Sequence, residues 1–145
     1  MKGLFAAASL AGLLALAPLA LASLAAPATA APAAGASYAT GRLTIGGETF
    51  EPAEVLDARA LPDINGKVGI MVTLTPPAAR RLEGISGSLV GRPMLVALDG
   101  TSLASELVRK PITDGVVEIP GRWTLSEGEA LARRISGKDP VPDDL

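Results

Sequence analysis

The chain has 145 residues, a net charge of −2, and neither histidine nor cysteine. This length suits one ordinary domain. The missing residue types exclude disulfides, a lipid anchor on cysteine, thiol nucleophiles, histidine bases and the usual zinc ligands. Because the chain also has no basic run, it lacks the charge with which proteins bind nucleic acid.

The N-terminal segment has the pattern of a secretory signal peptide. Lys2 precedes an uncharged apolar run over residues 3–26, and Ala28-Thr29-Ala30 fits the small-residue cleavage rule. We therefore expect a signal peptide at 1–30, export to the periplasm, a flexible linker at 31–41 and a domain at 42–142. The alternative is an uncleaved N-terminal anchor, because the apolar run is long enough to span a bilayer. After residue 30 no apolar stretch has that length.

The first half of the domain has the signals of three strands. Residues 42–45 and 48–50 flank Gly46-Gly47, which predicts a small hairpin. Residues 55–61 are a weaker strand candidate that ends at a turn-rich segment. Apolar residues alternate over 68–74, so this segment is predicted to be a half-buried strand.

A helix is expected next, with Thr75 as the residue whose hydroxyl caps it and Pro76-Pro77 in its first turn. Apolar residues recur on one helical face at spacings of four, three and four, and Gly91 is the expected end cap. The residues of this face are Ala78, Leu82, Ile85 and Leu89.

The second half predicts two further strands and then a third. Residues 94–98 are apolar without alternation, which indicates a central strand covered on both faces, or nearly so. Asp99-Gly100 is a strong hairpin signal that leads into a partner strand over 103–108. After a turn at 113–115, residues 116–119 form a short strand, and Pro120-Gly121 is expected to end it.

The last element is a helix that opens with a capping box at Thr124 and Glu127. It is expected to run to about Ser136, with Leu131 facing inward and Gly137 as its end cap. The order of elements predicts an α+β fold, in which an antiparallel sheet carries two helices on one face in the ferredoxin-like style.

No residue cluster predicts catalysis, a metal or a cofactor. The segment 84–88 is similar to a nucleophile elbow around Ser86, but Ser88 stands where the second glycine is required. We therefore assign Ser86 to the surface of a helix. Asp63-Ile64-Asn65-Gly66 lacks the later ligands of a calcium loop and is predicted to be a turn.

The remaining acidic residues that an enzyme would use are expected to have other roles. Asp99 and Asp114 are explained as turn residues, Glu118 lies in a strand, and Asp143-Asp144 belongs to a polar tail. The sequence therefore predicts that the protein is not an enzyme. Trp123 has two open interpretations: it packs onto the core beside the helix cap, or it anchors a bound peptide.

The order of these motifs resembles the head subdomain of the first large periplasmic domain of the SecD/SecDF family. The motifs that carry the resemblance are Gly91, Leu98-Asp99-Gly100, Pro111-Ile112-Thr113-Asp114-Gly115, Ile119, Gly121, Trp123, Thr124-Leu125, Gly137 and Pro140. The resemblance covers about residues 51–142. Departures include Ser105-Glu106, where the family usually has Ala-Pro, and Gly128, where it usually has Ala.

The resemblance implies a non-enzymatic periplasmic binding module, here as a separate secreted protein. Its expected partners are translocating or unfolded polypeptides, Sec components or other envelope proteins, bound at a sheet edge or in the groove beside the helices. The alternative is an envelope scaffold that reuses the fold and has no role in export. Neither interpretation assigns binding residues.

Overall fold

The computed structural model describes residues 37–143. The predicted signal peptide and the first part of the predicted linker lie outside these residues. Residues 37–41 run beside the end of the last helix, where the Tyr38 and Gly41 N–H groups donate to the Gly137 and Arg134 carbonyls at 2.9 and 3.0 Å.

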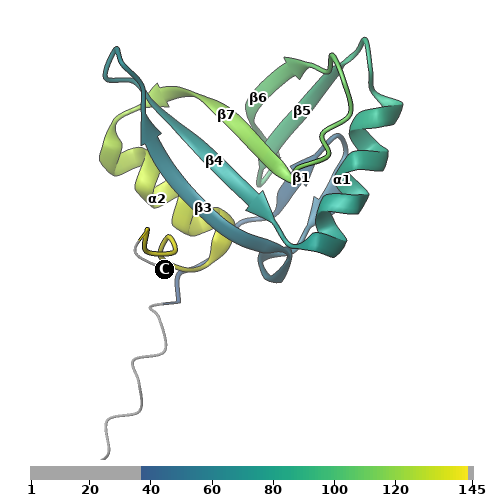
Figure 1. Ribbon diagram of the computed structural model, residues 1–145. Helices are drawn as coiled ribbons and strands as arrows, with labels where there is room; N and C mark the ends of the chain where they lie inside the picture. The colour runs from purple at the N-terminus through teal and green to yellow at the C-terminus, as the bar shows by residue number, and fades with distance from the viewer. Residues whose placement is uncertain (1–36, 144–145) are drawn as a thin grey trace, which may run out of the picture. The chain divides into compact units, whose positions relative to one another are not determined.

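The described strands form two antiparallel sheets (Figure 1). In the four-stranded sheet the order is β2-β1-β5-β6, and in the three-stranded sheet it is β3-β4-β7. The bounds in the four-stranded sheet are β1 Leu43–Ile45, β2 Glu48–Phe50, β5 Pro93–Leu98 and β6 Thr101–Leu107. The bounds in the three-stranded sheet are β3 Val55–Pro62, β4 Val68–Leu74 and β7 Val116–Trp123.

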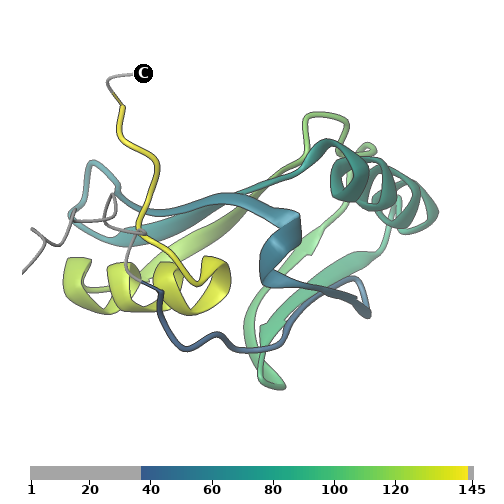
Figure 2. The ribbon, with the colours of Figure 1, turned by 90° about the horizontal axis from the view of Figure 1, so that it is seen from below.

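Two α-helices cover the sheets, and a 3-10 turn, η1 (Pro52–Glu54), precedes β3. Helix α1 (Pro76–Ser88) lies against the four-stranded sheet, where Ile85 closely approaches Gly46 in the β1–β2 turn. Helix α2 (Leu125–Ser136) packs mainly on β3. Figure 2 shows α2 below the three-stranded sheet and α1 above the strands of the other sheet.

The α+β class, with antiparallel strands and two helices, is confirmed, but the predicted single sheet is replaced by two. Each sheet is built from local hairpins, β1–β2 and β5–β6 in one and β3–β4 in the other. The pairings β1–β5 and β4–β7 join segments distant in sequence. Because the helices cover different sheets, the ferredoxin-like arrangement with both helices on one face is wrong.

One hydrophobic core is shared by both sheets and both helices. The alternation predicted for β4 is confirmed, because Val68, Ile70, Val72 and Leu74 are buried and the residues between them are half-buried. The core residues are Leu43, Ile45, Phe50, Val55, Ala58, Ile70, Val72, Leu74, Ala78, Leu82, Met94, Val96, Leu98, Leu103, Ala104, Val108, Val117, Ile119, Ala132 and Ile135.

The predicted hairpin turn at Asp99-Gly100 and the predicted capping box at the start of α2 are both confirmed. Asp99 and Gly100 have φ angles of 50° and 78°, as a two-residue hairpin between Leu98 and Thr101 requires. At the start of α2, the Thr124 N–H donates to a Glu127 carboxylate oxygen at 2.9 Å, and the Glu127 N–H donates to Thr124 Oγ1 at 3.3 Å.

Helix α1 differs from the prediction at both ends. Thr75 is the N-cap, but its side chain makes no capping hydrogen bond. Pro76 and Pro77 fill the first two helical positions, so two of the N–H groups that a cap would satisfy are absent. At the other end the cap is Leu89, and Gly91, with φ of 81°, lies beyond it in the connection to β5.

Strand β5 largely follows the prediction, whereas β7 differs from it. Strand β5 is central and nearly covered on both faces, as predicted, but Leu95 is 47% exposed on its outer face. β7 does not end at Pro120-Gly121 but continues to Trp123 through an irregularity opposite Gly69. Proline has no N–H to donate to a neighbouring strand. Strand β7 tolerates Pro120 because it is an edge strand, with a neighbour on one side only.

Candidate functional site: the edge of strand β6

Each sheet has two edge strands, β2 and β6 in one and β3 and β7 in the other. An uncovered edge offers unpaired backbone N–H and C=O groups, with which an extended polypeptide can pair as an added strand. The contacts made at each edge therefore decide where such a polypeptide can bind.

The β2 edge is short and covered by a side chain from α1. Strand β2 has three residues, and the Thr49 carbonyl accepts a hydrogen bond from Arg81 at 3.0 Å. The Arg81 guanidinium also lies 4.6 Å from the centre of the Phe50 ring and pairs with Glu54. This edge offers little free backbone.

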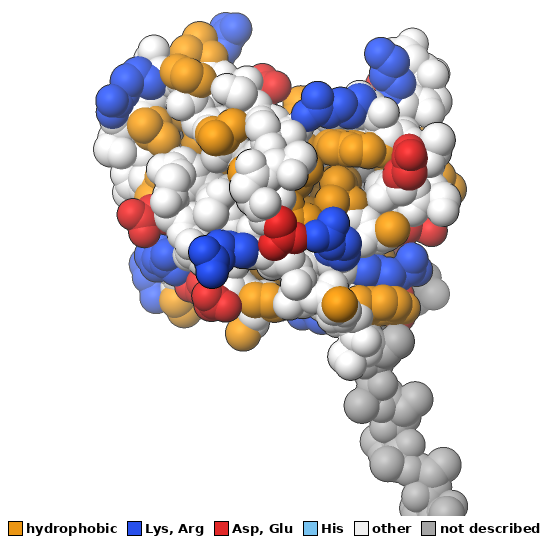
Figure 3. All heavy atoms as spheres, turned by 180° about the vertical axis from the view of Figure 1, so that it is seen from behind, with side chains coloured by type: hydrophobic (Ala, Val, Ile, Leu, Met, Phe, Trp, Pro, Cys, Tyr) orange, Lys and Arg blue, Asp and Glu red, His pale blue; other side chains and the backbone are white. Residues whose placement is uncertain are grey.

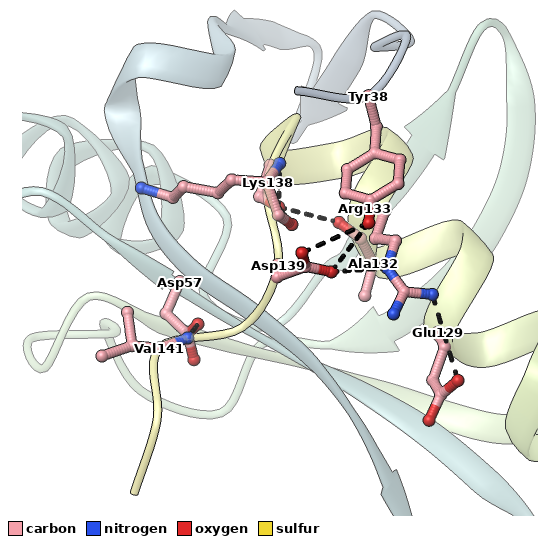
Figure 4. A network of polar contacts seen from close by, with 9 residues as sticks. Tyr38, Asp57, Glu129, Ala132, Arg133, Lys138, Asp139 and Val141 are labelled. Atoms are coloured by element: carbon pink, nitrogen blue, oxygen red, sulfur yellow. Dashed lines mark hydrogen bonds and ion pairs between the residues drawn. The ribbon is translucent and has the colours of Figure 1, made fainter. Parts of the chain in front are cut away.

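The C-terminal tail lies against strand β3 and is bonded to two of its side chains. Asp57, which is 7% exposed, accepts a hydrogen bond from the Val141 N–H at 2.8 Å. Arg59 donates to Asp57 at 2.6 Å and to the Val141 carbonyl at 2.8 Å, and it also pairs with Asp143. Figure 4 shows Val141 directly beside Asp57.

Further contacts hold the tail against the end of α2 (Figure 4). Asp139 accepts hydrogen bonds from the Tyr38 hydroxyl at 3.0 Å and from Arg133 at 2.8 Å. The Ser136 hydroxyl lies 3.1 Å from the Ala132 carbonyl and 2.9 Å from the Lys138 carbonyl. The tail and the residues before β1 are thus joined through α2.

The β7 edge is interrupted by its own sequence. The Val116 N–H is already bonded to Asp114 at 3.0 Å, and Pro120 has no N–H. The Leu74 N–H donates to the Gly115 carbonyl, so the backbone groups of Gly115 point toward β4. Because successive residues alternate in direction, the backbone groups of Glu118 point away from β4. Between these two positions, Glu118 alone offers a free N–H to a new strand.

The β6 edge is different. The Val108 N–H donates to the Arg92 carbonyl at 3.0 Å, so the backbone groups of Val108 point toward β5. Successive residues of a strand in an antiparallel pair point these groups alternately toward and away from the neighbouring strand. The backbone groups of Ser105 and Leu107 therefore point away from β5. No proline lies between Thr101 and Leu107. Within residues 37–143, the side-chain bond to this edge is the one from Arg122 to the Leu103 carbonyl.

A groove runs between this edge and β7, and we call it the β6 groove. Its volume is ≈ 260 Å³. Figure 3 shows a hollow in the back of the molecule in which hydrophobic side chains gather, with both basic and acidic side chains around it. The residues of the groove are Leu103, Ala104, Ser105 and Glu106 on one side and Pro120, Gly121 and Arg122 on the other.

Two exposed leucines lie on the outer face of the sheet beside this edge. Leu107 is 55% exposed and Leu95 is 47% exposed. Leu95 is opposite Ser105, and Leu107 follows two positions later on the same face of the neighbouring strand. The edge thus combines free backbone groups with apolar side chains.

A second hollow, of ≈ 330 Å³, lies on the other side of Pro120-Gly121. It is formed on the outer face of the three-stranded sheet, with Leu61 of β3 and Met71 of β4 among its residues. It is lined by the middle of the sheet as well as by the interrupted strand β7, and it includes none of the free backbone groups of β6.

Ser86 is not on the helix surface, and that prediction is wrong. Ser86 is fully buried, donates to the Glu83 carbonyl at 3.2 Å and accepts from the Ile112 N–H at 2.8 Å. It therefore attaches the β6–β7 connection to α1. A signal was present in the sequence, because Ser86 shares the helical face of Leu82 and Leu89 at spacings of four and three.

The acidic turn residues bond to nearby backbone. Asp63 accepts from the Asn65 and Lys67 N–H groups at 2.7 and 2.9 Å, which confirms the turn. Asp99 accepts from the Arg42 N–H at 2.8 Å and pairs with Arg134. Within residues 37–143, no group of three or more acidic side chains is placed to hold a metal ion.

Trp123 packs against the core while partly buried, as the first of its two interpretations predicts. The Arg122 guanidinium lies 5.6 Å from its ring. Trp123 is therefore the neighbour of a residue of the β6 groove, and its own ring contributes to packing.

The shifted pKa values belong to caps and ion pairs. A backbone hydrogen bond from Glu51 lowers the pKa of Glu54, and one from Thr124 lowers that of Glu127. Arg133 and then Tyr38 lower the pKa of Asp139, and hydrogen bonds to Asp57 and Asp143 raise that of Arg59. None of these groups lines the β6 groove.

Among the described residues, no helix is long and apolar enough to cross a membrane. The comparisons with known proteins give one consistent family. Residues 34–137 match the model of the SecDF P1 head subdomain.

Two curated relatives are translocase subunits. The chain is 30% identical over 99 residues to protein translocase subunit SecDF of Thermus thermophilus, covering 68% of this chain and 14% of the relative. It is 29% identical over 104 residues to protein translocase subunit SecD of Dictyoglomus turgidum, covering 71% of this chain and 25% of the relative. The chain thus spans a quarter or less of the length of these relatives.

Solved structures agree. A SecDF crystal structure in a super-membrane-facing form superposes with a TM-score of 0.57 and 31% identity, over 66% of this chain and 13% of that one. A second, of a membrane component SecDF that enhances protein export, gives a TM-score of 0.55 and 32% identity, over 63% of this chain and 42% of that one. On the family match and these likenesses together, the chain belongs to the SecDF P1 head subdomain family.

Proposed function

We propose that this protein is a non-enzymatic periplasmic module that binds unfolded, extended segments of polypeptides undergoing export. The observation that carries the proposal is the uncovered edge of β6, beside a groove and two exposed leucines. Family membership supplies the context, because the relatives are translocase subunits and one is described as enhancing protein export.

The physical argument rests on what an unfolded polypeptide presents. Its backbone N–H and C=O groups are unpaired and its apolar side chains are exposed, whereas a folded protein has paired most of the first and buried most of the second. A sheet edge binds the first kind of group and exposed leucines bind the second. The same surface offers little to a compact folded domain, so the proposal predicts selectivity for the unfolded state.

The proposal concerns binding alone. The part that this chain shares with its relatives is the head subdomain, which is a small fraction of their length. We therefore assign to it the contact with polypeptide and not the transport activity of a whole translocase subunit.

The test is the affinity of the purified full chain for one small protein in two states. A fluorescently labelled, reduced and alkylated protein that cannot fold is compared with its folded, disulfide-bonded parent by fluorescence anisotropy. We expect the unfolded form to bind at least about tenfold more tightly, a difference of ~1.4 kcal/mol. Equal affinity for both forms, or no binding to either, would contradict the proposal and favour an envelope scaffold.

A further inference from the structure

We propose that the partner binds as an added β-strand along β6, with Ser105 and Leu107 as the pairing residues. This inference rests on the function proposed above and specifies its geometry. The partner is an extended segment in which apolar residues alternate with basic or polar ones.

The backbone of β6 has the spacing that strand addition requires. Ser105 and Leu107 are alternate residues whose N–H and C=O groups point away from β5. In a strand such residues are about 7 Å apart, which matches the repeat of an extended partner. Of the other edges, β2 has three residues and β7 is interrupted, while β3 carries the C-terminal tail, which is bonded to the side chains of Asp57 and Arg59 on either side of the outward residue Ala58.

Arg122 sets one end of the added strand. Its guanidinium donates to the Leu103 carbonyl, so pairing cannot continue past Ser105 in that direction unless this bond breaks. Towards Leu107 no described side chain bonds to the edge. The added strand therefore lies over the Ser105–Leu107 half of β6, inside the β6 groove at one end and open at the other.

The side chains beside the edge determine what the partner presents on each face. On the outer face, Leu107 and Leu95 are exposed and favour an apolar residue of the partner. On the opposite face, the β6 groove holds one acidic and one basic side chain, Glu106 and Arg122. The Arg122 guanidinium is bonded at the Leu103 end, so Glu106, nearer the open end, favours a basic residue next to it. Because the side chains of a strand alternate, a segment of alternating apolar and basic residues satisfies both faces.

The first test removes the pairing group without removing the strand. The Ser105 N–H points away from β5, so Ser105→Pro deletes an outward donor and leaves the β5–β6 ladder intact. Ser105→Ala is the matched control, because it keeps the N–H. The probe is a short soluble peptide of alternating Val and Lys, and both full-length variants are first checked for a cooperative thermal transition. We expect at least tenfold weaker binding for Ser105→Pro and less than a twofold change for Ser105→Ala.

The second test needs no variant and covers the case in which Ser105→Pro fails to fold. Amide hydrogen exchange of the wild-type full chain is measured with and without the same peptide. The Ser105 and Leu107 amides should become protected, whereas the Glu106 amide, already bonded to β5, should not change. Peptide binding without protection at Ser105 and Leu107 would overturn strand addition at β6 while leaving the proposed function standing.

Two further outcomes have distinct meanings. No binding of either the peptide or the unfolded protein would overturn the proposed function, and this inference with it. Protection of Ser105 and Leu107 without any peptide, increasing with protein concentration, would show that the occupant of the edge is a second copy of this chain and would overturn the proposed partner.

Discussion

Strands β3 and β6 are both outer strands of antiparallel sheets, yet only β3 is bound by the C-terminal tail. Asp57 and Arg59 of β3 bind the tail at Val141, 84 residues further along the chain from Asp57. β6 has one side-chain contact, from Arg122 at Leu103. The difference teaches that a strand's own sequence does not decide whether its edge is open. What decides it is which distant segment folds over that edge.

Strand β7 shows a second way of closing an edge. Its closure is local, because Pro120 lacks an N–H and Asp114 occupies the N–H of Val116. The comparison between the closed edges and β6 can be tested by changing the contacts on which each depends.

The largest effect is expected at the irregularity in β7, which forms the wall of the β6 groove. A Cβ atom at Gly121 would lie 2.5 Å from the Val68 carbonyl carbon and 2.7 Å from the Gly69 nitrogen, and neither backbone atom can move away easily. We expect Gly121→Ala to lower the free energy of unfolding by about 3 kcal/mol, measured by urea denaturation. The control is Gly84→Ala, where a Cβ meets nothing within 4 Å and helix propensity improves by about 1 kcal/mol. Equal stabilities of the two variants would contradict the tight crossing of β4 and β7.

The next effect is expected at Ser86, which fixes the β6–β7 connection to α1. Ser86→Ala leaves the Ile112 N–H without its acceptor, at a cost of about 1.5 kcal/mol for a partly buried donor. The loss should appear in the unfolding midpoint and as faster amide exchange at Ile112. Ser88→Ala is the control, because the Ser88 side chain bonds only its own helix, at the Ile85 carbonyl. If the Ser88 variant loses as much, Ser86 has no special role.

A smaller effect is expected from opening the β3 edge. Asp57→Asn keeps an acceptor for the Val141 N–H but removes the charge that pairs with Arg59, so about 1 kcal/mol of stability should be lost. The Val141 amide should also exchange faster. Asp143→Asn changes the other carboxylate bound by Arg59, but its side chain is 83% exposed, and it should change stability little. Unchanged exchange at Val141 in the Asp57 variant would show that the tail is held by other contacts.

The smallest effect is expected from acid. The pKa of Asp139 is lowered by Arg133 and Tyr38, so its carboxylate binds protons less readily in the folded than in the unfolded chain. Its contribution to stability is present above the unfolded value, 3.8, and is lost as the pH falls through the lower folded value. The urea midpoint should therefore fall more steeply with acid in the wild type than in Asp139→Asn. Identical slopes would show that the tail is not held by this carboxylate.

Much of the fold could be predicted from local patterns. The alternation over Val68–Leu74, the Asp99-Gly100 hairpin and the Thr124–Glu127 capping box each depend on residues close in sequence, and all three are confirmed. In each case the physical cause, whether burial of one face, positive φ or an unsatisfied N–H, acts within a few residues.

The division into two sheets could not be predicted in this way. Alternation shows that one face of a strand is buried but not which strand lies beside it. The pairings β1–β5 and β4–β7 join distant segments, and a single sheet would bury the same residues. The sequence signal of Pro120-Gly121 was equally ambiguous, because the pair ends a strand or marks an irregularity within an edge strand.

The candidate site was predicted only as a kind of surface, a sheet edge or a groove, with no residues assigned. Ser105 and Glu106 were noted as departures from the family without a structural meaning. Their position on the open edge depends on β6 being an outer strand and on the tail folding over β3 instead. Both facts arise from tertiary structure.

The measurement that tests the account most directly compares photocrosslinking from β6 and β3 in living cells. A photoreactive amino acid replaces Leu107 of β6 in one variant and Leu56 of β3 in another, and the two leucines are similarly exposed, at 55% and 49%. The cells export a tagged reporter that is stalled before it folds. The account predicts a crosslink to the reporter from position 107 and little from position 56. Equal crosslinking from both positions, or a crosslink from position 56 alone, would contradict the claim that the open edge of β6 is the binding site.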